Sequence, residues 1–132
     1  MNIERTTVAG LFGSPVVPHA VRAGSLLFVS GTLGWVDREG SIPEDFASEA
    51  RAALENVRTV AAVHGCELTD IVKLGVFLAR LEDAAAFNAV YAEFFPRERP
   101  ARSTVGAPLL MGASIEIDAI CSIPDGMIKA SE

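Results

Sequence analysis

Two charged residues lie in otherwise apolar stretches near the C-terminal end of the sequence. Arg102 belongs to the segment ARSTVG and Glu116 to the segment SIEIDAI. An arginine fork can hold a carboxylate with two parallel hydrogen bonds, a geometry that lysine does not reproduce. A carboxylate can orient and polarise a water for attack on an electrophilic carbon. The pair could therefore form a hydrolytic site, or it could form ordinary ion pairs on a wet sheet face, which spacing alone slightly favours.

Both segments read as strands, and strand alternation sorts their side chains by face. Arg102 shares one parity with Thr104, and Glu116 shares one parity with Asp118. If the two strands form a hairpin around residues 108–112, Arg102 lies opposite Asp118 and Thr104 lies opposite Glu116. All four would then share the sheet face away from the helices. The other parity of the second strand is apolar, as expected of a core face: Ile115, Ile117, Ala119 and Cys121.

Upstream elements must position these strands. Residues 21–31 predict two short strands around a turn at 23–25. Residues 43–64 have helical spacing, with Pro43 in the first turn and Gly65 as a left-handed stop. Residues 71–78 are nearly all apolar, which predicts a central strand buried on both faces.

A second helix follows residues 71–78. Phe87, Val90, Tyr91 and Phe94 form its apolar stripe, Asp83 is placed to cap it through its side chain, and Pro96 stops it. The order of strands, helix, strand, helix and two strands predicts an α+β fold with both helices on one face of a single sheet. The bare sheet face would need another layer, and self-association into a symmetric oligomer is the simplest source.

Composition narrows the class of protein. The 132 residues suit one domain, which we expect to span 1–132, and a net charge of −6 argues against nucleic acid as a partner. The start, MNIERTTVAG, lacks the apolar core of a signal peptide, and no stretch reaches roughly 18 apolar residues, so we expect a cytoplasmic protein without membrane contact. Cys66 and Cys121 have no metal or redox spacing and are expected to be buried free thiols.

Other candidates for chemistry are weaker. His19 and His64 have no acid or cysteine at a catalytic or zinc-binding spacing, which predicts surface or packing roles. Ser30 lacks the flanking glycines of a nucleophile elbow. Trp35 and Tyr91 are expected to pack, because no basic residues are interleaved with them.

Four segments resemble the Rid (YjgF) family of small imine and enamine deaminases: HAVRAGSLLFVSG, ARAALENVRTVAAVHG, DIVKLGVFLARLEDAAAFNAVYAEFF and PARSTVGAPLLMGASIEIDAI. The resemblance implies a chorismate-mutase-like fold and a homotrimer, with its sheets around a central barrel and its sites in the clefts between subunits. It also implies hydrolysis of reactive 2-imino or enamine acids of the 2-aminoacrylate type to 2-keto acids and ammonia, without cofactor or metal.

The resemblance also implies residue roles. Arg102 matches the arginine that holds the substrate carboxylate, and Glu116 matches the acid that positions water. Ser30, Gly31 and Asn88 match further characteristic positions, Gly31 through its backbone, and we expect all three to contact substrate.

The chain departs from the family pattern at three positions. Val17 replaces a tyrosine that borders the site, and His19 stands where glutamine is common. Thr104, in the catalytic signature, stands where cysteine is frequent. These changes point to an altered substrate, for example a larger one contacting Val17, or to weak deaminase activity. Two alternatives stay open: a specialised catabolic deaminase, for example of 2-aminomuconate, and a non-catalytic trimer that binds small carboxylates or acts like a chaperone.

Overall fold

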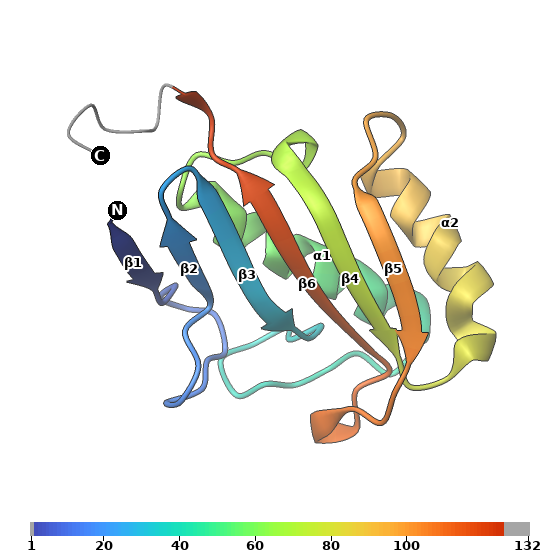
Figure 1. Ribbon diagram of the computed structural model, residues 1–132. Helices are drawn as coiled ribbons and strands as arrows, with labels where there is room; N and C mark the ends of the chain where they lie inside the picture. The colour runs from blue at the N-terminus through green and yellow to red at the C-terminus, as the bar shows by residue number, and fades with distance from the viewer. Residues whose placement is uncertain (1, 126–132) are drawn as a thin grey trace.

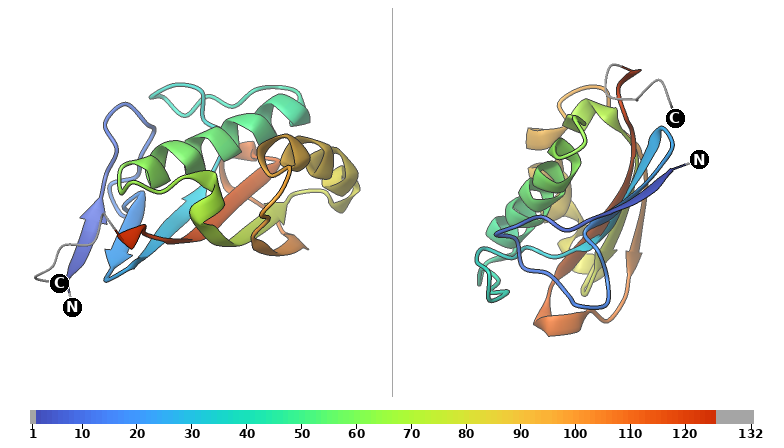
Figure 2. Two further views of the ribbon diagram at one scale, coloured as in Figure 1. Left: turned by 90° about the horizontal axis from the view of Figure 1, so that it is seen from above. Right: turned by 90° about the vertical axis from the view of Figure 1, so that its left-hand side faces the viewer.

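The computed structural model describes residues 2–125 and shows a six-stranded sheet with two α-helices on one face (Figure 1). Figure 2 shows the helices in one layer and the sheet in the other, as predicted. Residue 1 and residues 126–132 of the expected domain lie outside the described residues. The elements are β1 (Ile3–Thr6), β2 (Ala20–Ala23), β3 (Leu26–Thr32), α1 (Phe46–Ala62), β4 (Ile71–Leu78), α2 (Ala84–Phe94), β5 (Ala101–Gly106) and β6 (Ile115–Ser122).

The strand order is β1-β2-β3-β6-β4-β5, and only the β4–β5 pair is parallel. The predicted hairpin between β5 and β6 is therefore wrong. After the crossover through α2, β5 pairs with β4 at the edge of the sheet, and β6 pairs with β3 on one side and β4 on the other. Both edges of β6 are thus occupied, so it has no edge left for β5.

The long helix α1 begins at Phe46 instead of Pro43. Asp45 is its N-cap, and the side chain of Asp45 accepts a hydrogen bond from the Ser48 N–H at 2.9 Å. The expected stop is confirmed, since Gly65 adopts a φ of +76° just after the helix. At α2, Asp83 occupies the N-cap position, but its side chain makes no capping hydrogen bond, so that part of the prediction is wrong.

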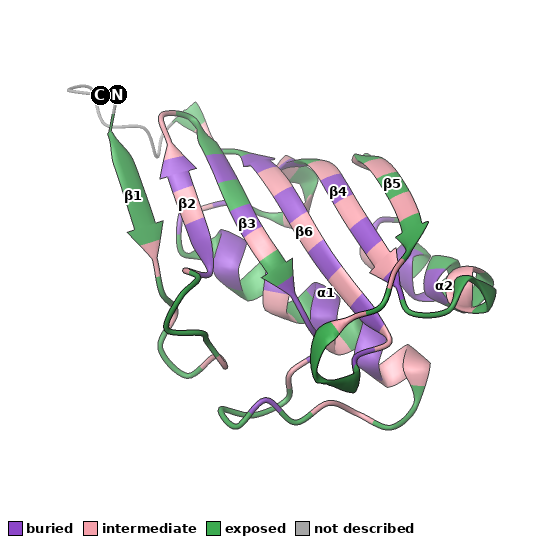
Figure 3. Cartoon of the chain, turned by 60° about the horizontal axis from the view of Figure 1, so that its bottom comes forward, coloured by how far each residue is buried: buried purple, intermediate pink, exposed green. Residues whose placement is uncertain are grey.

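The hydrophobic core lies between the helices and one face of the sheet. Its largest buried side chains include Leu54, Leu74, Phe87, Ile115 and Ile117. Figure 3 shows the resulting alternation of buried and half-buried residues along β4 and β6. In the single chain, β4 is buried on one face only, because Phe77 on the other face is half-buried. The two free thiols are buried as expected, and burial raises the pKa of Cys121 to about 12.

Among residues 2–125, no helix has the length and apolar character that a membrane crossing requires.

A buried acid fixes the start of β6 against α1. Glu49 lies in the first turn of α1, and its Oε2 accepts hydrogen bonds from the backbone N–H groups of Ser114 at 2.7 Å and Ile115 at 3.3 Å. The same residue packs against Gly34, where an added Cβ would overlap the Glu49 carbonyl. One side chain thereby positions both β6 and the segment that follows β3.

Glu49→Ala is expected to lower the free energy of unfolding by about 2–6 kcal/mol, because two backbone donors lose their acceptor at about 1–3 kcal/mol each. Urea denaturation measures the change. Glu93→Ala is the matched control: it removes an exposed partner of Arg51 and should cost much less than Glu49→Ala. Equal losses in the two variants would contradict the role of Glu49.

Candidate active site

Arg102 lies on edge strand β5 and is held by side chains from β5 and α2. Its Nε donates to the Thr104 Oγ1 at 2.8 Å and its Nη2 donates to the Asn88 Oδ1 at 2.7 Å. The guanidinium carbon lies 5.0 Å from the ring centroid of Phe87 and 4.7 Å from that of Tyr91. Two hydrogen bonds and two aromatic faces thus fix the plane of the guanidinium.

Part of the guanidinium is available to a ligand. Arginine has five N–H donors, and the two used here leave the Nη1 donors and one Nη2 donor. Within residues 2–125, no acid pairs with Arg102. The expected contact with Asp118 is therefore wrong. A fixed, unpaired guanidinium is suited to binding a carboxylate.

Glu116 projects from β6 over the backbone of β3. A Cβ added to Gly31 would overlap the Glu116 carboxylate, so this position needs glycine for the carboxylate to lie where it does. Gly75 has the same relation to Asp118 on the neighbouring strand. Gly31 was expected to contact substrate through its backbone, which stays a prediction; the neighbour that the structure shows is the Glu116 side chain.

Burial raises the pKa of the Glu116 carboxyl, and the charge of Asp118 raises it further. Burial also raises the pKa of Asp118, although the Gly75 N–H and the charge of Lys73 oppose this. A carboxyl with a raised pKa takes up and releases a proton closer to neutral pH, as general acid–base chemistry requires. Asp118 was expected only as an ion-pair partner of Arg102. It raises the pKa of Glu116 instead, because the two side chains lie on the same face of β6.

A cavity of about 380 Å³ opens beside Glu116. Three expected substrate contacts, Val17, Ser30 and Gly31, line it. Its remaining walls are Phe12, Gly13, Ser14, Val16, Pro18, His19, Thr32, Leu33, Trp35, Leu110 and Met111. Apart from His19 and Trp35, these residues were not identified from the sequence, because all but Thr32 at the end of β3 lie in loops and short turns without periodic spacing.

Two polar residues of this cavity have structural hydrogen bonds. The Ser30 hydroxyl donates to the Pro18 carbonyl at 2.7 Å, in keeping with its not being a nucleophile. His19 is buried, its Nδ1 accepts from the Val8 N–H at 2.8 Å, and its Nε2 donates to the Phe12 carbonyl at 2.8 Å. These bonds require the neutral Nε2–H tautomer, and the packing role expected for His19 is confirmed.

The predicted site residues form two clusters on opposite faces of the sheet. Leu74 lies beside Arg102 on the helix-covered face, whereas Phe77 lies beside Glu116 on the open face. The expectation that Arg102, Thr104, Glu116 and Asp118 share the open face is therefore wrong for the first two. Thr104 and Asn88 cluster with Arg102, and the other cluster comprises Val17, Ser30, Gly31 and Glu116.

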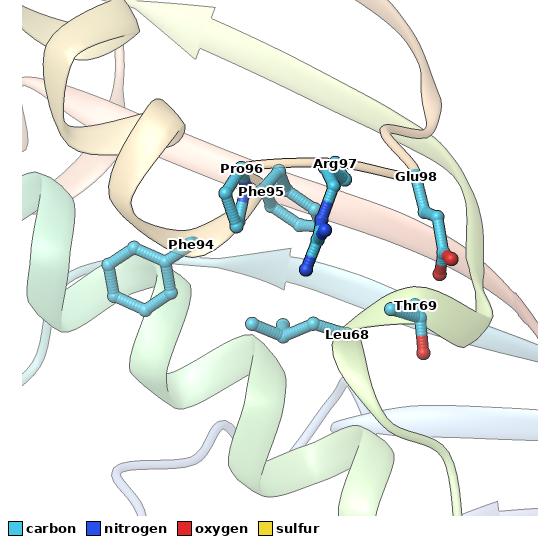
Figure 4. Close-up of a pocket in the computed structure, with 7 residues that line it drawn as sticks. All are labelled: Leu68, Thr69, Phe94, Phe95, Pro96, Arg97 and Glu98. Carbon is cyan, nitrogen blue, oxygen red and sulfur yellow. The ribbon is translucent and has the colours of Figure 1, made fainter.

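A second cavity, of about 260 Å³, lies beyond the end of α2 and shares no residue with the first (Figure 4). Figure 4 shows Phe94 at one end of it and Thr69 and Glu98 at the other. Among the described residues, no group of three or more His, Cys, Asp or Glu side chains is placed to hold a metal ion.

Comparison with known proteins identifies the family. A family model described as "Endoribonuclease L-PSP" matches residues 14–123. The 2-iminobutanoate/2-iminopropanoate deaminase of Dermatophagoides farinae is 34% identical over 127 residues, which cover 93% of this chain and 99% of that protein. The chain belongs to the Rid (YjgF) family.

Solved structures of Rid proteins share the fold. The crystal structure of the YjgF gene product of E. coli matches with a TM-score of 0.84 and 31% identity, over 92% of this chain and 99% of that one. That of E. coli TdcF with bound serine matches with a TM-score of 0.77 and 35% identity, over 89% and 93% of the two chains. The resemblance read from the sequence and the predicted fold class are thus confirmed.

Proposed function

We propose that this protein hydrolyses carboxylate-bearing 2-imino acids to 2-keto acids and ammonia, at a site built from Arg102 of one copy and Glu116 of another. The observation that carries the proposal is the placement of these groups on opposite faces of one sheet. The name of the D. farinae relative and the serine in the TdcF structure support a small substrate that carries a carboxylate.

The exposed apolar residues of the open sheet face support an assembly. Leu26, Phe28 and Val105 are exposed in the single chain, and another copy would cover them. In a ring, the β5 edge of each copy can meet the Glu116 cavity of the next, which gives one site per interface. We propose a homotrimer with the open faces around its centre.

The chemistry uses the two clusters in different ways. The free donors of Arg102 bind the substrate carboxylate and place the imine carbon near Glu116. The Glu116 carboxylate takes a proton from water while the oxygen forms a bond to that carbon and the π pair of the C=N bond moves to nitrogen. Glu116 then gives this proton to nitrogen, which completes a neutral carbinolamine. In the second step Glu116 passes the hydroxyl proton to the amino group, the carbon–nitrogen bond breaks with its electron pair on nitrogen, and ammonia leaves as the carbonyl of the 2-keto acid forms.

The remaining expected site residues have supporting roles in this proposal. Thr104 and Asn88 each accept a hydrogen bond from Arg102, so we assign both as positioning residues that set the plane of the guanidinium. Gly31 gives Glu116 its space, and Val17 and Ser30 border the substrate cavity.

The test is the disappearance of 2-iminopropanoate generated in situ, which the protein should accelerate over buffer. Arg102→Lys is expected to lower kcat/KM by roughly 10- to 150-fold, because losing one charge-assisted pairing costs about 1.5–3 kcal/mol. Arg51→Lys, an exposed arginine paired with Glu93, is the control and should keep full activity. Wild-type kcat/KM in Arg102→Lys would contradict carboxylate binding by Arg102.

The alternative functions have less support. A dicarboxylic substrate such as 2-aminomuconate would place its second carboxylate in a cavity where, within residues 2–125, no lysine or arginine is part of the lining. An RNA substrate, which the description of the family model suggests, conflicts with a net charge of −6. A non-catalytic trimer would bind 2-keto acids and show no turnover of imines, so the same assay separates it from a deaminase.

A further inference from the structure

We propose that the cavity beside Glu116 selects 2-imino acids with a large apolar side chain, of the kind derived from phenylalanine or leucine. The inference rests on the proposed deaminase function and adds the substrate class. It follows from the apolar walls of the cavity, from the hydrogen bonds that its polar side chains already make, and from its volume.

The walls are aromatic and aliphatic. The rings of Phe12 and Trp35 pack with their centroids 5.2 Å apart and their planes at 43°. Val16 and Val17 line the cavity and are 84% and 48% exposed. An apolar substrate group would therefore meet an apolar surface that water covers in the free protein.

Most polar side chains of the cavity are already hydrogen-bonded within the chain; one exception is the Trp35 Nε1–H, which is buried and has no hydrogen-bond partner among the described residues. The hydroxyl of Ser30 donates to Pro18, and that of Thr32 donates to the Ser30 carbonyl at 2.7 Å. Both ring nitrogens of His19 have backbone partners. A carboxylate on the substrate side chain would meet no lysine or arginine in the described part of the lining and would be repelled by ionised Glu116, so it would lose its hydration without gaining a cationic partner.

The size of the cavity sets the preference between small and large side chains. A volume of about 380 Å³ is within the range of small-molecule sites and exceeds what a single methyl group fills. One methylene added to or removed from a substrate in a hydrophobic pocket changes kcat/KM by roughly 10- to 200-fold. We therefore expect the imine from phenylalanine to be hydrolysed with a kcat/KM at least tenfold above that of the imine from alanine.

The experiment compares imines generated in situ by amino acid oxidases from phenylalanine, alanine and glutamate. The expected order of kcat/KM is phenylalanine, alanine, glutamate. Val17→Tyr narrows the cavity and should lower the phenylalanine-to-alanine ratio by about tenfold. Val63→Tyr makes the same change at an exposed position after α1 and should leave the ratio unchanged. If Val17→Tyr misfolds, Val16→Tyr tests the same wall, since Val16 is more exposed.

The outcomes separate the two proposals. If the alanine imine is hydrolysed and the phenylalanine imine is no better, the side-chain inference fails and the deaminase function stands. The same holds if glutamate gives the best substrate, or if tyrosine at both positions 16 and 17 leaves the ratio unchanged. If no imine disappears faster than in buffer, the deaminase function itself fails.

Discussion

Replacing Glu116 with glutamine is expected to lower kcat for imine hydrolysis by about 10²- to 10⁴-fold, the range for loss of a general acid–base group. Glutamine keeps the size of the side chain and its place over Gly31, but it cannot take the proton from water. In the wild-type protein, kcat/KM should fall as the pH drops through the raised pKa of Glu116, at a higher pH than for an ordinary glutamate. The measurement is turnover of in-situ imine across a pH series.

The same substitution should not destabilise the fold at neutral pH. Burial and Asp118 raise the pKa of Glu116 in the folded chain, so folding favours its protonated form. That contribution to stability is fully present below the unfolded pKa and is lost as the pH rises through the folded pKa. Glutamine does not ionise, so the Glu116→Gln variant does not lose stability in this way as the pH rises. Its free energy of unfolding at pH 7 should therefore equal or exceed that of the wild type. A large drop in stability at pH 7, or unchanged turnover, would contradict the proposed role.

Mixing two inactive variants is expected to restore activity. One variant carries Arg102→Ala and keeps Glu116, and the other carries Glu116→Gln and keeps Arg102. Each site is proposed to take Arg102 from one copy and Glu116 from the next. In rings assembled at random from equal amounts of the two variants, each of these residues is present at a given site with a probability of one half. About a quarter of all sites should therefore be intact. Subunits are exchanged by unfolding and refolding the variants together, and kcat per chain is measured before and after.

The control for this exchange replaces the Glu116→Gln chain with a chain that carries both substitutions. No copy then has Arg102, so activity should stay at the level of the parents. Restoration only in the complementary mixture demonstrates a site shared between copies. If the complementary mixture also stays inactive after verified exchange, both groups act within one chain and the composite site is wrong.

Local sequence patterns predicted much of the fold. The apolar parity of Ile115 and Ile117 identified the core face of β6, and Gly65 marked the end of α1. The two helices on one side of a single sheet, and the open face opposite, followed from the order of elements. Strand faces and helix ends depend on side chains two to four residues apart, so they can be predicted directly from local sequence patterns.

The site depended on information that spacing does not carry. Arg102 and Glu116 were identified from their residue types and from the family resemblance, but their relative placement was wrong because a short connection was taken to mean a hairpin. Phe12 and Met111 were missed, since loops bring them to the cavity.

The sequence by itself therefore determined the family, most of the secondary structure and the chemical types of the two central groups, although it did not predict β1. Only the tertiary structure decided that β6 lies between β3 and β4, that Arg102 rests on the rings of α2, and that Glu116 faces the other way. The physical reason is that strand order results from competition among long-range pairings, each of which gains its hydrogen bonds only when distant segments meet.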